Sequence, residues 1–178
     1  MSDSFDGVIG HERVVDLLRR EVSAPAQAYL FTGPDSVGKA TLAVRFAAAL
    51  LCAERGQHDV ECRSCRLVRE GVHPDVTVVE PEGATSLGVD QAREVVTRSS
   101  LRPVESDRSV FLFPEAGTMT EQAANALLKT LEEPTASVVF LLVAESEDDF
   151  PATVASRCRT IHVGRVPQAT MVAALEGR

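Results

Sequence analysis

The sequence predicts an α/β fold in which a parallel sheet is flanked by helices on both faces. Short apolar runs alternate with segments of helical periodicity along most of the 178 residues, and such alternation is typical of a parallel sheet. The run Val138–Val143 is apolar throughout, as expected for a strand at the centre of that sheet. Apolar residues make up 44% of the chain, which is enough for a buried core.

In the first half of the chain, the run Ala28–Thr32 reads as a short buried strand, and a glycine-rich turn follows it. The alanine-rich segment Lys39–Leu51 then predicts an apolar helix. Residues 76–79 form a second candidate strand. The segment Val89–Ser99 has its apolar side chains at helical spacing, at Val89, Ala92, Val95 and Val96.

In the second half, residues 110–113 predict a third strand and Glu121–Glu132 a helix. Within that helix the apolar residues recur at i, i+3, i+4 and i+7, at Ala124, Leu127, Leu128 and Leu131. Thr120 is a candidate N-cap, and Pro134 ends the helix. After the run Val138–Val143 we expect a short helix including Thr153 and Val154, and a strand over residues 160–163.

Two composition changes divide the chain. Residues 53–73 are polar and rich in cysteine, so residues from about 52 to 73 are interpreted as an inserted module. A Gly-Arg-Val-Pro stretch follows Val163, and a new helix is expected near Gln168. We therefore expect one domain over residues 1–165 and the truncated start of a second over 166–178.

Charge and hydropathy exclude several classes of protein. A net charge of −8 argues against a freestanding binder of duplex DNA, which usually carries a basic face. No apolar run approaches the roughly 20 residues of a membrane span, and the polar N-terminus is not a signal peptide. A cytoplasmic protein without membrane contact is expected, and its four cysteines indicate metal binding or burial.

The turn after the first strand matches the phosphate-binding loop G-x-x-x-x-G-K. In such a loop, backbone N–H groups and a helix N-terminus surround the phosphates, and the lysine reaches the outer ones. The Ser or Thr that should bind Mg²⁺ is replaced by Ala40, and Thr41 lies one residue late, about 100° around the helix. The candidate nucleotide-binding residues are Gly33, Asp35, Ser36, Val37, Gly38, Lys39, Ala40 and Thr41.

The second half of an ATPase site is also altered. An apolar strand should end in the Asp that holds the metal, but residues 110–113 are followed by Pro114, which cannot coordinate a metal. One acidic residue, Glu115, remains. Two independent losses in one Mg²⁺ site predict negligible hydrolysis.

Several strings spread along the chain are characteristic when they occur together. They are Phe5-Asp-Gly-Val-Ile-Gly10, Ala28-Tyr-Leu-Phe-Thr-Gly-Pro34, Leu50-Leu-Cys52, a Cys-x-x-Cys with His73-Pro-Asp75, Ala124-Asn-Ala-Leu-Leu-Lys-Thr-Leu-Glu-Glu-Pro134 and Ser156-Arg-Cys158. Together they resemble the AAA+ clamp-loader subunits of bacterial DNA polymerase III. The Leu-Leu-Lys-Thr-Leu-Glu-Glu-Pro string with Ser-Arg-Cys is specific to clamp loaders, whereas the phosphate loop occurs widely. The altered Mg²⁺ site, together with His73-Pro-Asp75, favours the delta-prime branch over the tau/gamma motor branch.

The resemblance implies an AAA+ domain over residues 1–165 and the start of a helical lid over 166–178. It also implies a subunit poor in ATPase activity, in a hetero-pentamer with tau/gamma and delta subunits that loads the sliding clamp onto primer–template DNA. ATP or ADP would bind weakly. Arg157 would serve in trans, on the nucleotide of the neighbouring motor subunit; the alternative is a surface arginine paired with Asp148 or Asp149.

Cys52, Cys62 and Cys65 resemble three of the family's four ligands to a structural zinc ion. The family pattern would place a cysteine where this chain has Asp59, with His58 beside it. Either can bind Zn²⁺, and Asp59 is slightly favoured; alternatively the site is lost and the cysteines are simple thiols. Cys158 adjoins an apolar strand and reads as a small buried hydrophobe.

Two further functions remain open at this point. One is an active ATPase that uses Thr41 and Glu115 in unusual roles. The other is a zinc-stabilised protein-interaction module whose phosphate loop binds nothing. ATP turnover separates the first from a clamp-loader subunit without ATPase activity, and a nucleotide-dependent thermal shift separates the second.

Overall fold

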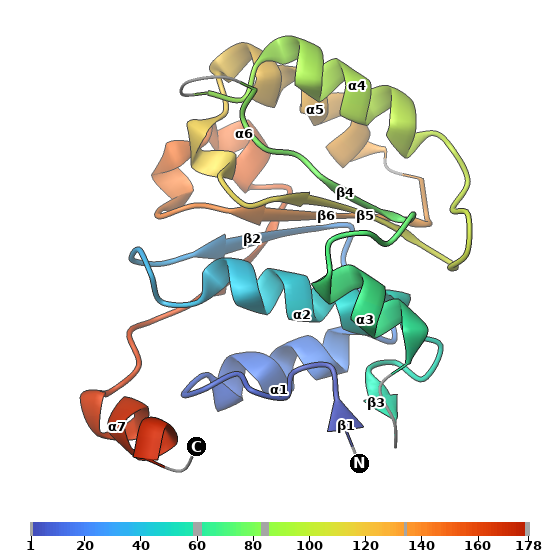
Figure 1. The fold of residues 1–178 in the computed structure, drawn as a ribbon. Coiled ribbons are helices and arrows are strands. Elements are labelled where there is room, and N and C mark those ends of the chain that lie inside the picture. The colour runs from blue at the N-terminus through green and yellow to red at the C-terminus, as the bar shows by residue number, and fades with distance from the viewer. Residues whose placement is uncertain (1, 59–61, 83–85, 134, 177–178) are drawn as a thin grey trace.

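The protein folds around a five-stranded parallel sheet flanked by helices, as predicted (Figure 1). The computed structural model describes residues 2–58, 62–82, 86–133 and 135–176. The strand order is β4-β5-β6-β2-β7, so the wholly apolar strand β6 is central. The bounds are β2 (Ala28–Thr32), β4 (Val76–Val78), β5 (Ser109–Phe113), β6 (Val138–Val143) and β7 (Arg159–His162).

Helices cover both faces of this sheet (Figure 1). On one side α2 (Lys39–Leu51) packs against the strands, and α1 (Glu12–Glu21) and α3 (Arg63–Arg69) lie on the same side. The other side carries α4 (Val89–Ser99), α5 (Glu121–Glu132) and the short α6 (Ala152–Ala155). Two single-turn 3₁₀ helices, η1 (Ala116–Thr118) and η2 (Glu147–Asp149), follow β5 and β6.

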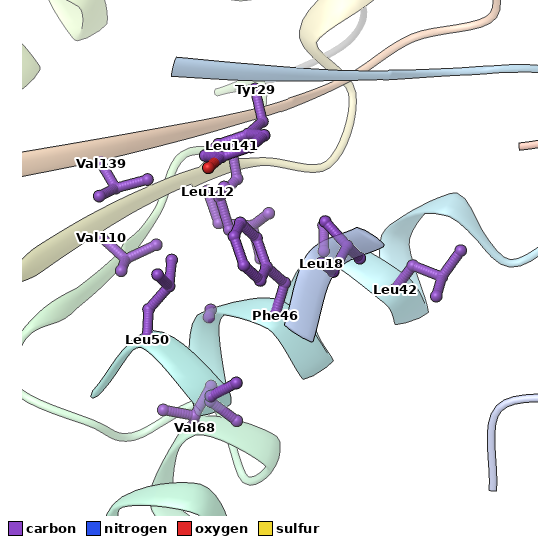
Figure 2. Close-up of a cluster of buried hydrophobic side chains, with 14 of the residues drawn as sticks. Leu18, Tyr29, Leu42, Phe46, Leu50, Val68, Val110, Leu112, Val139 and Leu141 are labelled. Atoms are coloured by element: carbon purple, nitrogen blue, oxygen red, sulfur yellow. The ribbon is translucent and has the colours of Figure 1, made fainter. Parts of the chain in front are cut away.

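The two sheet faces bury separate apolar clusters. Figure 2 shows the cluster between the sheet and α2, where the Tyr29 ring meets the edge of Phe46 with centroids 4.9 Å apart. Val68 from α3 joins this cluster, so the cysteine-rich module is anchored in the main core. On the other face Phe111 and Phe140 stack at 5.5 Å.

Several elements were absent from the sequence prediction. Helix α1 does carry apolar residues at helical spacing, at Val14, Val15, Leu17 and Leu18, but the prediction did not include this pattern; Val15 and Leu18 are buried. Helix α3 is seven residues long and lies inside the polar module. Strands β1 (Ser2–Asp3) and β3 (Gln57–His58) have two residues each and pair antiparallel, away from the main sheet. Such short elements carry no measurable periodicity.

Predicted details of the helix ends agree with the structure. The Thr120 side chain accepts a hydrogen bond from the Ala123 N–H and so caps α5, which has the predicted bounds. The short helix around Thr153 is α6. Cys158 is partly rather than fully buried, packs against the second cluster and donates to the Val154 carbonyl.

The last described helix, α7 (Gln168–Glu176), lies apart from the sheet and is joined to β7 by an extended stretch (Figure 1). It exposes Met171 and Val172. That residues 166–178 begin a second domain remains a prediction. None of the helices in the described part of the chain is long and apolar enough to cross a membrane.

Candidate functional sites at the two ends of one helix

The phosphate loop lies between the carboxyl end of β2 and the start of α2. Gly33 begins it with φ near +147°, and a Cβ at this position would lie 2.0 Å from the Val163 carbonyl oxygen. Gly38 ends it at φ +95° as the N-cap of α2. Both positions require glycine, so the tight turn between β2 and α2 depends on these two residues.

Lys39 is the first residue of α2 and is buried, with 7% of its surface exposed. Its Nζ donates to the carbonyl oxygens of Gly33 and Pro34, each at 2.6 Å. A bound phosphate would compete with these two acceptors for the ammonium group. His11, which the sequence did not single out, donates from Nε2 to the Val37 carbonyl at 2.8 Å and braces the loop.

The two altered positions of the expected Mg²⁺ site, Ala40 and Pro114, lie close together in the structure. Ala40, Thr41 and Pro114 line a single cavity of about 380 Å³ with Lys39. Asp35, Ser36, Gly38 and Val143 complete its lining. The strand and loop therefore bring together the positions that should carry the metal ligands, and two of those positions have no ligand atom.

An adjoining cavity of about 500 Å³ is rich in carboxylates. Glu115, Glu145 and Asp149 line it together with Asp35 and Lys39. Asp149 is fixed there because its Oδ2 accepts hydrogen bonds from the backbone N–H groups of Glu145 and Ser146, at 3.1 and 3.0 Å. Four carboxylates around one lysine repel a polyphosphate.

Sequence reasoning missed Glu145 and Asp149 as residues of this cavity. A signal was present, because both follow β6, the strand that pairs with β2. The carboxyl ends of neighbouring parallel strands share one edge of a sheet.

A second cluster lies at the other end of α2. Cys52, His58, Cys62 and Cys65 each place one ligand atom so that all four lie within 4.8 Å of one another. Cys52 is the C-cap of α2, His58 ends β3, and Cys62 is the N-cap of α3. Among the described residues, one imidazole and three thiols thus converge, and Asp59 lies outside the described residues.

The chemistry of these donors fits a structural zinc ion, which is closed by four Cys or His ligands. The His58 side chain is buried and its Nδ1 has no hydrogen-bond partner within the described chain. All three cysteines are free thiols, and the Cys52 and Cys62 sulfurs are 3.7 Å apart.

The thiols differ in acidity. Burial raises the pKa of both Cys52 and Cys65. At Cys62 burial acts in the same direction, but hydrogen bonds led by the Cys65 N–H outweigh it and lower the pKa.

A His-Pro-Asp turn, in which His73 and Asp75 are buried, joins the cysteine module to the sheet. The Asp75 carboxylate accepts hydrogen bonds from the backbone N–H groups of Val104, Glu105 and Ser106. Although burial acts to raise the pKa of Asp75, these three donors outweigh it and lower the pKa. Arg63 of α3 forms an ion pair with Glu105, so the loop held by Asp75 also holds the module.

Arg157 lies just beyond α6 and is about one third exposed. Its guanidinium donates to Glu132 Oε1 at 2.5 Å and to the Thr153 carbonyl. In the alternative reading, Arg157 pairs with a local carboxylate such as Asp148 or Asp149; the structure shows such a pair, but the partner is Glu132 at the end of α5. Within the described chain, Arg157 lines neither cavity of the phosphate loop.

Comparison with known proteins identifies the family of the chain. A family model described as DNA polymerase III, delta subunit, matches residues 10–167. The DNA polymerase III subunit delta' of Pseudomonas aeruginosa is 41% identical over 136 residues, which is 75% of this chain and 42% of that protein. The chain belongs to the delta-prime family.

This delta-prime family member is also similar to a tau subunit and to a solved gamma-related structure. The DNA polymerase III subunit tau of Bacillus subtilis is 31% identical over 94% of this chain and 30% of its own length. A crystal structure of a DNA polymerase III gamma subunit-related protein from Thermotoga maritima has a TM-score of 0.64 at 24% identity, covering 87% of this chain and 47% of that one. The fold is thus that of the AAA+ P-loop proteins, and the chain spans less than half the length of these relatives.

Proposed function

We propose that this chain is a clamp-loader subunit that hydrolyses no ATP itself. It assembles with tau/gamma motor subunits and a delta subunit into a hetero-pentamer, which places the sliding clamp on primer–template DNA in the cytoplasm. One observation carries the proposal: Lys39, Ala40 and Pro114 line the same cavity. A delta-prime family member with this cavity keeps the phosphate loop and lacks the groups that would hold Mg²⁺.

The charges around the phosphate loop oppose tight binding of a triphosphate. Mg²⁺ bridges the outer phosphates and neutralises charge that develops during phosphoryl transfer. Here the carboxylates Glu115, Glu145 and Asp149 lie beside the loop, and without a bound cation they oppose a triphosphate. ATP or ADP therefore binds weakly, through the loop backbone over residues 33–41 and through Lys39.

Arg157 acts in trans on the nucleotide of the neighbouring motor subunit. Its planar guanidinium suits phosphate oxygens, and it lies outside the lining of this chain's own two cavities in the described residues. Its pair with Glu132 is partly exposed on both sides. Exposed ion pairs contribute about 0.2–1 kcal/mol, so release toward a neighbour costs little.

Cys52, His58, Cys62 and Cys65 hold a structural Zn²⁺. The ion would supply no reaction chemistry, because four protein ligands close its coordination sphere. Its effect is to join the end of α2, strand β3 and the start of α3. We favour His58 over Asp59 because the imidazole lies within the cluster.

The runner-up function is a tau/gamma-like motor subunit. The similarity to tau over 94% of the chain supports it. Ala40 and Pro114 speak against it, because they provide no side-chain ligand for Mg²⁺ and a motor needs that ion.

The assembly is tested by co-purification. The full-length protein carrying an affinity tag should recover tau/gamma and delta subunits from its host, and the recovered complex should load the clamp. Recovery of the protein alone under conditions that preserve other replication complexes would contradict the proposal. ATP turnover by the isolated chain at the rate of an ordinary ATPase would favour the motor function.

The trans role of Arg157 is tested by Arg157→Ala in the assembled loader. Arginines supplied in trans accelerate phosphoryl transfer by about 10³ to 10⁵, so the ATPase stimulated by clamp and DNA should fall steeply. The variant should still fold and assemble. A matched control is Arg93→Ala, which removes an exposed arginine paired within α4. Unchanged ATPase and clamp-loading rates in the Arg157→Ala loader would show that Arg157 is only structural.

A further inference from the structure

The N-terminal segment lies against the metal cluster. Strand β1 pairs antiparallel with β3, with Ser2 opposite His58 and Asp3 opposite Gln57. The Ser4 N–H then donates to the Gly56 carbonyl at 2.8 Å. The backbone that carries His58 is therefore held in place by the first residues of the chain.

Ser4 makes a side-chain contact inside the cluster. Its Oγ lies 3.2 Å from the Cys65 sulfur, and the two residues are 3% and 2% exposed. They are 61 positions apart in sequence. The site is tight, because a Cβ on Gly56 would lie 3.0 Å from the same Oγ. A hydroxyl buried in this way faces a sulfur rather than water.

We infer that Ser4 is a positioning residue of the metal site, and that metal binding and docking of residues 2–6 strengthen each other. The inference rests on the proposed zinc site. When Cys65 ligates a metal as a thiolate, its sulfur has no proton to donate, so the Ser4 hydroxyl is the donor. A hydrogen bond to a charged acceptor is about twice as strong as a neutral one.

The coupling is reciprocal by thermodynamic linkage. If the docked segment favours the metal-bound state by some factor, the metal favours docking by the same factor. Groups that hydrogen-bond to metal ligands typically change metal affinity about 10–100-fold. The Ser4 hydroxyl is such a group on a segment that otherwise contributes no ligand.

A second set of contacts docks the segment without touching the cysteines. Arg19 of α1 binds the Asp3 carboxylate through Nε and Nη2, each at 2.8 Å. Its guanidinium carbon also lies 5.9 Å from the centre of the Phe5 ring. These contacts allow docking to be weakened from a distance, which separates coupling from direct damage to the site.

The first test measures zinc affinity by competition with a chromophoric chelator. Ser4→Ala should bind Zn²⁺ about tenfold more weakly than the unaltered chain, at the lower end of the range for such partners. Ser100→Ala, an exposed serine at the end of α4 on the other side of the sheet, should leave the affinity unchanged. The unfolding temperature of the metal-free forms shows whether Ser4→Ala acts on the metal site or on the fold as a whole.

The second test uses Arg19→Ala and hydrogen exchange. Loss of a partly exposed ion pair should weaken zinc binding about twofold, and the Ser4 amide should exchange faster in metal-free than in zinc-loaded protein. Equal zinc affinity in Ser4→Ala and unaltered chains, or equal protection of that amide with and without zinc, would overturn the inference. If the unaltered chain binds no zinc, the metal site itself fails as well; clamp-loader assembly is measured separately by co-purification.

Discussion

The two ends of helix α2 carry two candidate binding sites, which differ in how many of their binding groups are present. At its start, the phosphate loop keeps its glycines and Lys39; at its end, Cys52 joins a cluster of four potential metal ligands. The two ends are about 20 Å apart for 13 residues. The loop is shaped by backbone geometry, which survives when neighbouring side chains change, whereas Mg²⁺ binding depends on two side chains that are absent here.

We expect the largest effect from removing one of the four potential metal ligands at the end of α2. Cys62→Ser should abolish zinc binding, because a structural site needs all its ligands, and lower the free energy of unfolding by about 4 kcal/mol or more. For a chain of this size that is a fall of about 10 °C in unfolding temperature. Elemental analysis should find about one zinc per unaltered chain.

The control for this substitution is Cys158→Ser, since Cys158 does not belong to the four potential metal ligands. Its zinc content should match that of the unaltered chain. A metal-free Cys62→Ser protein as stable as the unaltered one would remove the structural role from the cluster.

The next effect concerns the joint between the cysteine module and the sheet. Asp75→Ala removes the acceptor of three backbone N–H groups, and hydrogen bonds to a charged group contribute about 1.5–3 kcal/mol each. We expect a loss of about 3 kcal/mol. Chemical denaturation measures it, with the exposed Asp90→Ala as the matched control.

The Asp75 carboxylate should also change how the stability of the fold depends on pH. Because the folded pKa of Asp75 is lowered, its contribution is fully present above the unfolded value of about 3.9 and is lost as pH falls through the folded value. Asp75→Asn should therefore flatten the acid limb of the stability curve between these two values. An acid limb identical to that of the unaltered chain would show that the hydrogen bonds add nothing to folding.

We expect the smallest effect when the missing Mg²⁺ ligands at the phosphate loop are restored. In the double variant Ala40→Thr, Pro114→Asp, Mg²⁺ should strengthen ATP binding, and ATP at about ten times its dissociation constant adds about 1.4 kcal/mol of stability. A shift of about 3–5 °C should follow. The unaltered chain should show no Mg²⁺-dependent shift and negligible hydrolysis.

Adding Lys39→Ala to this double variant provides the control, since it removes the cation that should bind the outer phosphates. The shift should then disappear. If the unaltered chain already shows the full shift with Mg²⁺, its carboxylates hold the ion in some other way, and the contrast between the two ends of α2 would not stand.

The sheet, the main helices and the phosphate loop could be predicted from the sequence. Helices such as Glu121–Glu132 were predicted to the residue, because apolar periodicity, an N-cap and a proline are local signals. The two alterations at Ala40 and Pro114 were also visible in the sequence, because the phosphate-loop motif and the end of an apolar strand define those positions. Cys52, Cys62 and Cys65 were singled out because they resemble three of the zinc ligands of the family.

Contacts between groups that are distant in the sequence could be seen only in the three-dimensional structure. Ser4 reaches Cys65 because β1 pairs with β3, and two-residue strands leave no periodic pattern. Glu145 and Asp149 join the phosphate cavity through the order of the strands. Arg157 pairs with Glu132, 25 positions away, instead of with the nearer acids. In each case the partner is set by how elements pack, and packing depends on long-range contacts that local sequence does not encode.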